Sequence, residues 1–132
     1  MKLSGRIIFP GETSGEALVS SQGISFYGGV DPETGIIVEK DHDLRGSCIA
    51  GKILVYPTGK GSTVGSYTLY RLKKNDLAPL AILNTECEPI TAIGCILAEI
   101  PCIDQLPLDR IQSGMQIIVD ANQGDIEISE IA

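Results

Sequence analysis

The chain has 132 residues, of which 43% are hydrophobic and 20% are charged, and its formal net charge is −7. This length suits one domain, and the hydrophobic fraction is enough for a packed core, so the composition argues against two ordinary domains and against disorder. An acidic chain lacks the basic surface that phosphate backbones require, which argues against nucleic-acid binding.

The residues available for the core are mainly aliphatic, since the chain has 19 isoleucines, no tryptophan and only six aromatic residues. No stretch approaches the roughly 20 apolar residues of a membrane helix. The first residues also lack the long apolar region of an export signal. We therefore expect a cytoplasmic protein without membrane contact, whose four cysteines are buried thiols rather than disulfides.

The first half of the chain is predicted to form short strands separated by turns. Its apolar segments lie at residues 2–9, 16–20, 25–30 and 36–38. Turn signals interrupt them at Pro10-Gly11 and at residues 31–35, which hold a proline and a glycine. Residues 39–46 are mostly charged and end in glycine, so we expect an exposed loop there.

The second half has the pattern of alternating strands and helices. Residues 52–56 are a continuous apolar run with β-branched side chains, typical of a parallel strand buried on both faces. A glycine-rich turn follows at residues 58–61, then a helical periodicity over residues 62–74 and a second buried strand at residues 80–83. This order predicts a right-handed βαβ unit. In the helix, the periodicity places Val64, Thr68 and Leu72 on the buried face and Ser66 on the other.

A second crossover is predicted to follow the first. Pro89 can begin a helix that runs to about Glu99, and residues 100–103 form a short strand. Two late strands are expected at residues 114–120 and 125–128. The predicted fold class is α/β: one domain over residues 1–132, with a β-rich N-terminal half packed against a parallel βαβ half.

The segment Pro57–Ser66 is the strongest candidate for a functional site. It follows a predicted parallel strand and begins a helix, and ligands of α/β sheets bind beyond such strand ends. The unpaired amides and partial positive charge of a helix N-terminus favour an anion there. Glycines would let the backbone approach a ligand closely. The candidate residues are Gly59, Lys60, Gly61, Ser62 and Thr63.

A glycine-rich turn before a helix has two other common interpretations. A nucleotide-binding P-loop is excluded, because the position of its first glycine is occupied by Leu54 and Lys60 is followed by Gly61. The simpler alternative is that Ser62 only caps the helix.

His42 and the cysteines offer weaker candidates. His42, the only histidine, could be a proton donor or an interface contact, but a solvated loop histidine is the favoured interpretation. Cys87, Cys95 and Cys102 are separated by seven and six residues, without the close pair typical of iron–sulfur and zinc sites. We therefore predict no metal site in this chain.

The residues around the candidate site resemble those of the small subunit of the aconitase X family. The resemblance is most specific in the turn Thr58–Thr63, with the strand before it and the helix start at Gly65-Ser66. Asp41–Gly46 before that strand also matches. The similarity continues through residues 78–82, 100–102 and 114–120, so that it covers almost the whole chain.

The resemblance implies a swivelling β/β/α domain that acts with a large subunit, which holds a 4Fe–4S cluster. It implies a hydro-lyase active only as the two-subunit complex, with Ser62 as the proton acceptor. Archaeal members of this type remove water from (R)-5-phosphomevalonate to give trans-anhydromevalonate 5-phosphate, on the mevalonate route to isoprenoids. Related bacterial proteins dehydrate cis-3-hydroxy-L-proline, which leaves that substrate as an alternative.

Two non-dehydratase functions remain open at the level of sequence. One is a swivelling phosphocarrier module, which would need a phosphorylatable histidine; His42 lies instead between Asp41 and Asp43, which would repel a phosphoryl group. The other is a non-catalytic anion-binding module that uses the same helix N-terminus.

Overall fold

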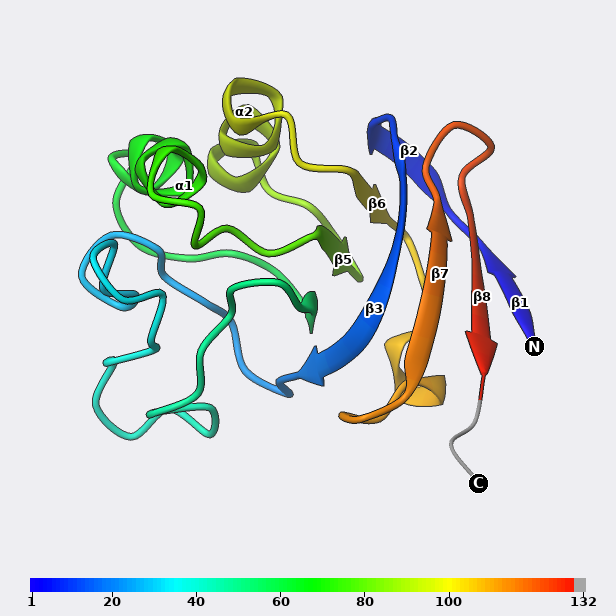
Figure 1. Cartoon of the computed structure of the whole chain (residues 1–132), viewed down its shortest axis with the longest axis horizontal. Coiled ribbons are helices and arrows are strands. Elements are labelled where there is room, and N and C mark those ends of the chain that lie inside the picture. The colour runs from blue at the N-terminus through cyan, green and yellow to red at the C-terminus, as the bar shows by residue number, and fades with distance from the viewer. Residues whose placement is uncertain (130–132) are drawn as a thin grey trace.

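A computed structural model describes residues 1–129 (Figure 1). Its strands are β1 (Lys2–Ser4), β2 (Arg6–Phe9), β3 (Glu12–Val19), β4 (Ile53–Tyr56), β5 (Ala81–Asn84), β6 (Cys102–Asp104), β7 (Gln116–Asp120) and β8 (Asp125–Ser129). Its helices are α1 (Gly65–Lys74), α2 (Pro89–Ala98) and the short 3₁₀ helix η1 (Leu108–Arg110).

All eight strands belong to one sheet in the order β1-β8-β7-β3-β4-β5-β6-β2. The two edge strands, β1 and β2, are consecutive in the chain and are separated only by Gly5. The sheet must therefore curl until its two edges meet at that residue. A Cβ atom on Gly5 would lie 2.1 Å from the Asp104 carbonyl oxygen, so only glycine fits at this junction.

The predicted βαβ units are both present. Strands β4, β5 and β6 run parallel to one another, with α1 crossing from β4 to β5 and α2 from β5 to β6. The two helices lie side by side on the same face of these strands (Figure 1). The mixed α/β fold class predicted from the sequence is confirmed.

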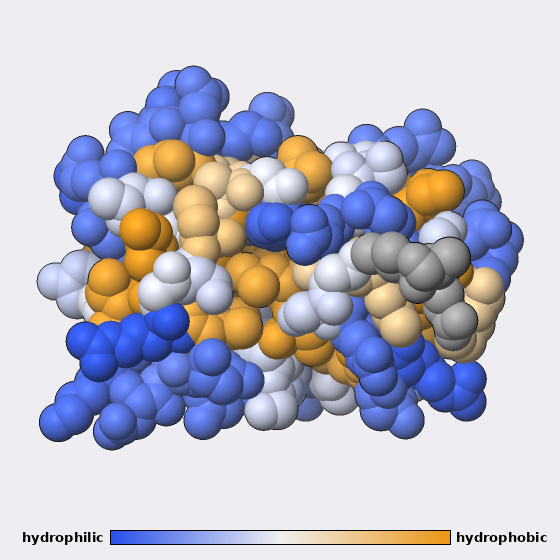
Figure 2. Space-filling view, turned by 60° about the horizontal axis from the view of Figure 1, so that its bottom comes forward, coloured by the Kyte–Doolittle hydropathy of each residue, from blue (hydrophilic) through white to orange (hydrophobic). Residues whose placement is uncertain are grey.

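The strands bury both of their faces, and this divides the core into two clusters. Leu54 and Tyr56 of β4 point to the helices, whereas Ile53 and Val55 point to the inside of the curled sheet. All four are completely buried. The alternation follows from the two-residue period of a strand. Figure 2 shows that apolar side chains reach the surface mainly in the middle of the face drawn there, with hydrophilic residues around them.

Several predicted elements differ from the observed ones. The predicted strands at residues 25–30 and 36–38 are wrong: those residues form only isolated bridges, such as that between Val30 and Ile37. The antiparallel half of the sheet is not purely N-terminal, because β7 and β8 from the end of the chain pair with β3 and β1. The predicted strand over residues 2–9 is divided in two where the sheet closes.

The helix α1 begins at Gly65, three residues later than predicted. The expected faces are also wrong at two positions: Val64 is 44% exposed, and Ser66 is buried. Burial of Ser66 is possible because its hydroxyl donates a hydrogen bond to the Ile90 carbonyl oxygen at 2.7 Å.

Candidate functional site

The loop Pro57–Val64 leaves the C-terminal end of β4 and leads into α1, as predicted. It runs beside the segment around Ile24, with which it exchanges two backbone hydrogen bonds: Lys60 N–H donates to the Ile24 carbonyl at 3.0 Å, and Ile24 N–H donates to the Thr58 carbonyl at 3.3 Å. The site is therefore built from three segments that are distant in sequence, since the start of α2 also touches this loop.

The two glycines of the loop provide room for other side chains of the same protein. A Cβ atom on Gly59 would lie 2.1 Å from Glu88 Oε1, and one on Gly61 would lie 2.3 Å from Ser25 Oγ. Gly61 also has a positive φ of 92°, which favours glycine. Both glycines are thus needed for the shape of the loop, a requirement that is separate from the close approach to a ligand expected from the sequence.

Ser62 does not cap α1, so the simpler interpretation of this residue is wrong. The N-cap is Val64, which makes no side-chain hydrogen bond. The Ser62 hydroxyl accepts a hydrogen bond from Val64 N–H at 3.2 Å, and the residue is exposed. The serine therefore stands at the surface just before a helix N-terminus. Thr63 is exposed beside it.

Lys60, the cation of the loop, is paired with an acidic residue. Its Nζ lies 2.7 Å from Glu39 Oε2, in a half-exposed ion pair. Glu39 comes from the charged segment that precedes β4. Any anion held by Lys60 must therefore compete with this carboxylate.

The N-terminus of α2 is already occupied by a carboxylate. Glu88 is its N-cap, and its side chain accepts hydrogen bonds from Ile90 N–H at 2.7 Å and Thr91 N–H at 2.8 Å. The first turn of α1, in contrast, contains no acidic residue. The amides at the start of α1 already donate to backbone carbonyls, Gly65 N–H to Ser62 at 2.9 Å and Tyr67 N–H to Val64 at 3.0 Å. The α1 N-terminus therefore offers an external anion the partial positive charge of the helix rather than unpaired amides.

Sequence reasoning did not identify Glu88 or Ser25 as parts of this site. An acidic residue directly before Pro89 is a recognisable helix start, which could have indicated the cap. The contact of Glu88 with Gly59 had no signal in the sequence, because it depends on how the two crossovers pack.

His42 is a buried structural residue, so the expectation of a solvated loop histidine is wrong. Its side chain is 1% exposed. Its Nε2 lies 3.0 Å from the Gly23 carbonyl oxygen, and its Nδ1 accepts a hydrogen bond from Leu44 N–H at 3.0 Å. Nδ1 also lies 3.1 Å from Asp43 Oδ1. With both nitrogens engaged inside the protein, His42 offers no site for a phosphoryl group.

The neighbouring Asp43 anchors this segment and gives it a pH dependence. Partial burial raises the pKa of Asp43, but hydrogen bonds from Ser20 and Ser21 outweigh it and keep that pKa below its ordinary value of 3.8. The folded state thus favours the carboxylate, and its contribution to stability is present above about pH 4 and is lost as the pH falls through the lowered pKa.

We expect Asp43→Asn to have a lower free energy of unfolding than wild type at pH 7. At pH 3 the difference between the two proteins should be smaller, because wild type has then lost part of the contribution of the carboxylate. Urea unfolding of both proteins at the two pH values measures this. A difference that is the same at pH 7 and pH 3 would contradict the assignment.

The prediction that all four cysteines are buried free thiols is confirmed for three of them. Cys87, Cys95 and Cys102 are buried free thiols, and Sγ of Cys102 lies 3.9 Å from Sγ of Cys87. The contact with Cys102 and burial raise the pKa of Cys87 well above its ordinary value. Cys48, however, is exposed. Within residues 1–129, no group of three or more His, Cys, Asp or Glu side chains could hold a metal ion.

This difference in exposure predicts the reactivity of the thiols. In the native protein, iodoacetamide should modify Cys48 and leave the three buried thiols unmodified, whereas all four should react in guanidinium chloride. Mass spectrometry of peptides from both samples measures the pattern. Rapid native modification of Cys87 or Cys102 would show that the core around them opens readily.

None of the helices described over residues 1–129 has the length and apolar character needed to cross a membrane.

Comparisons with known proteins cover nearly the full chain. Residues 2–128 match the family model of the aconitase X swivel domain. The chain is 53% identical to the phosphomevalonate dehydratase small subunit of Thermococcus kodakarensis, with 98% of each chain covered. It is 51% identical to the protein of the same name from Methanosarcina mazei, covering 97% of this chain and 91% of that one.

Solved structures show the same similarity. The crystal structure of Thermococcus kodakaraensis aconitase X in its holo-form superposes with a TM-score of 0.97 at 52% identity, covering 98% of this chain and 99% of the other. A solution NMR structure of a UPF0107 protein superposes with a TM-score of 0.90 at 45% identity, covering 98% and 100%.

Proposed function

Since this chain belongs to the aconitase X family, we propose that it is the small subunit of a two-subunit hydro-lyase that dehydrates (R)-5-phosphomevalonate to trans-anhydromevalonate 5-phosphate. The observation that carries the proposal is about 50% identity, over nearly the full length of both chains, to relatives named phosphomevalonate dehydratase small subunit. The pathway is the archaeal mevalonate route to isoprenoids.

The proposed reaction divides naturally between two subunits. Loss of water from a 3-hydroxy acid needs a base for the proton on the carbon beside the carboxylate, and a Lewis acid on the departing hydroxyl. An exposed iron of a 4Fe–4S cluster would supply the Lewis acid. We place this cluster on the large subunit, as the family resemblance implies. The described residues of this chain include no group of three or more His, Cys, Asp or Glu side chains that could hold a metal ion. This chain then supplies the base and contacts to an anion.

We assign the base to Ser62. Its hydroxyl is exposed, just before a helix whose first turn contains no acidic residue. A serine hydroxyl is a weak base unless its alkoxide is stabilised, and a helix N-terminus contributes only about 0.3–2 kcal/mol, roughly one pKa unit. Most of the stabilisation must therefore come from residues of the large subunit and from exclusion of water.

The backbone amides from Gly61 to Thr63 and the Lys60 ammonium are the proposed anion contacts of this chain. Because Lys60 is paired with Glu39 at 2.7 Å, it would exchange this carboxylate for the anion of the substrate or for the Ser62 alkoxide. A flexible four-carbon side chain that is half exposed can make such an exchange.

Anaerobic reconstitution with the cognate large subunit tests the proposed function. The complex should convert (R)-5-phosphomevalonate to the anhydro product, detected by mass spectrometry as loss of one water, while each subunit alone should be inactive. The same assay with cis-3-hydroxy-L-proline tests the alternative substrate. Turnover of that compound alone would overturn the substrate assignment, and no turnover of either by a cluster-loaded complex would overturn the proposed function.

A further inference from the structure

The helix α2 has an unusual composition for a helix at the surface. Its sequence, Pro89–Ala98, contains no charged residue. One face packs on the sheet through buried residues that include Cys95 and Ala98, but the other exposes Ile93, Ile96 and Leu97 by 51%, 53% and 43%. A helix that is apolar on all sides is normally covered on all sides.

The neighbouring helix α1 continues this apolar surface. Val64, Tyr67 and Tyr70 are 44%, 68% and 40% exposed. The chain has only six aromatic residues, so two exposed tyrosines on one helix are a large share of them. Tyrosine is enriched at the centre of protein interfaces because it combines a large apolar area with a polar tip.

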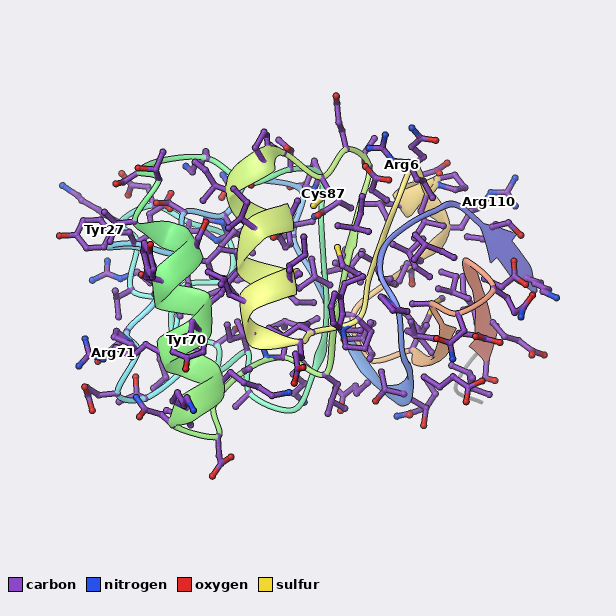
Figure 3. All side chains as sticks on the ribbon, turned by 90° about the horizontal axis from the view of Figure 1, so that it is seen from above. Arg6, Tyr27, Tyr70, Arg71, Cys87 and Arg110 are labelled. Carbon is purple, nitrogen blue, oxygen red and sulfur yellow. The ribbon has the colours of Figure 1, made fainter. Side chains whose placement is uncertain are left out.

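Close packing of the two helices brings these side chains onto one surface. Ser66 of α1 donates a hydrogen bond to the Ile90 carbonyl of α2, and a Cβ atom on Gly94 would lie 2.5 Å from Leu69 Cδ1. Viewed from above, the helices are adjacent, and Tyr70 lies on the upper side of α1 (Figure 3). We define the apolar helix surface as Val64, Tyr67, Tyr70, Ile93, Ile96 and Leu97.

A groove on the other flank of α1 extends this surface. It has a volume of about 490 Å³ and is lined by Val64 and Tyr67 of the apolar helix surface and by Tyr27, Val30 and Val38 from the segment that packs against α1. Tyr27 is itself 56% exposed and lies beside the start of the helix (Figure 3). The groove could receive an apolar side chain from a partner.

The apolar helix surface is continuous with the proposed active site. Val64 is only two residues from Ser62, and both helices begin at the same edge of the sheet as the serine loop. A partner that completes the site around Ser62 must reach this edge. We propose that the apolar helix surface and its groove are the docking surface for the large subunit, an inference that rests on the proposed function.

Two lysines at the C-terminal end of α1 indicate the charge of the partner surface. Lys73 and Lys74 make no ion pair with any residue between 1 and 129, and Nζ of Lys74 lies 5.4 Å from the centroid of the Tyr70 ring. These lysines form a basic margin on a chain of net charge −7. The matching surface is apolar opposite the two helices and acidic opposite the end of α1.

The test compares two exposed isoleucines in the complex. Ile96 on α2 is 53% exposed, and Ile118 on β7, outside the proposed docking surface, is 51% exposed. The dissociation constant of the small and large subunits is measured anaerobically by calorimetry for wild type, Ile96→Asp and Ile118→Asp, with Tyr67→Ala as a second interface variant. Far-UV circular dichroism and thermal unfolding check that each variant is folded.

We expect Ile96→Asp to raise the dissociation constant at least 30-fold, Tyr67→Ala to raise it about 10-fold, and Ile118→Asp to change it less than threefold. At a saturating concentration of small subunit, Ile96→Asp should recover most of the wild-type kcat, because it affects assembly. If folded Ile96→Asp and Tyr67→Ala both bind the large subunit as tightly as wild type does, the inference is wrong. The proposed function would still stand in that case, provided that the wild-type complex is active.

Sedimentation of the isolated small subunit tests whether the apolar helix surface binds a second copy of this chain instead of the large subunit. If wild type self-associates, Ile96→Asp abolishes this, and affinity for the large subunit does not change, then the surface binds a second copy and the inference is wrong. Failure of the wild-type subunits to bind each other at all would instead contradict the proposed function.

Discussion

Replacing Ser62 by alanine is expected to lower the kcat of the reconstituted complex by about 10²–10⁴-fold, the range for loss of a general base. The side chain is exposed and its one described hydrogen bond is to Val64 N–H, so the change should alter the free energy of unfolding by about 0.5 kcal/mol or less. Affinity for the large subunit and the KM should stay within about threefold of wild type. Steady-state kinetics under anaerobic conditions measure the effect.

Two matched variants make this result specific. Ser14→Ala removes an exposed hydroxyl from β3, away from the serine loop, and should leave kcat unchanged. Ser62→Thr keeps a hydroxyl at the proposed reacting position and should retain measurable turnover. Wild-type kcat in a saturated complex of Ser62→Ala would remove this serine from the mechanism.

Gly59→Ala is expected to lower both the stability of the protein and the kcat of the complex. The added methyl group would lie 2.1 Å from Glu88 Oε1 and 2.5 Å from Thr91 Oγ1. Thr91 is completely buried, so the loop or the Glu88 carboxylate has to move. Loss of the cap costs about 1 kcal/mol of stability. A displacement of the loop by about 1 Å should lower kcat roughly 10²-fold.

A double-mutant cycle distinguishes the two consequences of this change. In the Glu88→Ala background the cap is already absent, so Gly59→Ala should reduce the free energy of unfolding less than it does in wild type. Activity should still fall, because the contact with Thr91 remains. Equal and additive losses of stability would show that the methyl group is accommodated without disturbing Glu88.

The βαβ half of the fold could be predicted from the sequence because local patterns determine it. The run Ile53–Tyr56 is buried on both faces, and each crossover is delimited by turn residues. The antiparallel half could not be assembled in the same way. Strands β3 and β7 pair residues one hundred or more positions apart, as in Glu12 with Asp120, and no local sequence pattern indicates such a pairing.

For the candidate site, too, the features set by local sequence could be predicted and the contacts between distant segments could not. Its position beyond a parallel strand follows from the order of elements, and the serine loop lies where that order places it. The ion pair of Lys60 with Glu39 and the close approach of Glu88 to Gly59 are contacts between segments far apart in sequence. Burial of His42 was mispredicted for a related reason: a charged segment can still direct one side chain into the core if backbone groups satisfy it.

The junction at Gly5 has a consequence for the order in which the protein can be made and folded. Strand β1 pairs with β8, Lys2 opposite Glu127, so β1 has no partner strand until β8 has been synthesised. Until then both margins of the sheet stay open to other chains. Such distant pairing is slow to form, because closing a long loop costs entropy before the contact compensates. Closure through Gly5 thus makes the synthesis of β8 a condition for pairing β1 within the sheet.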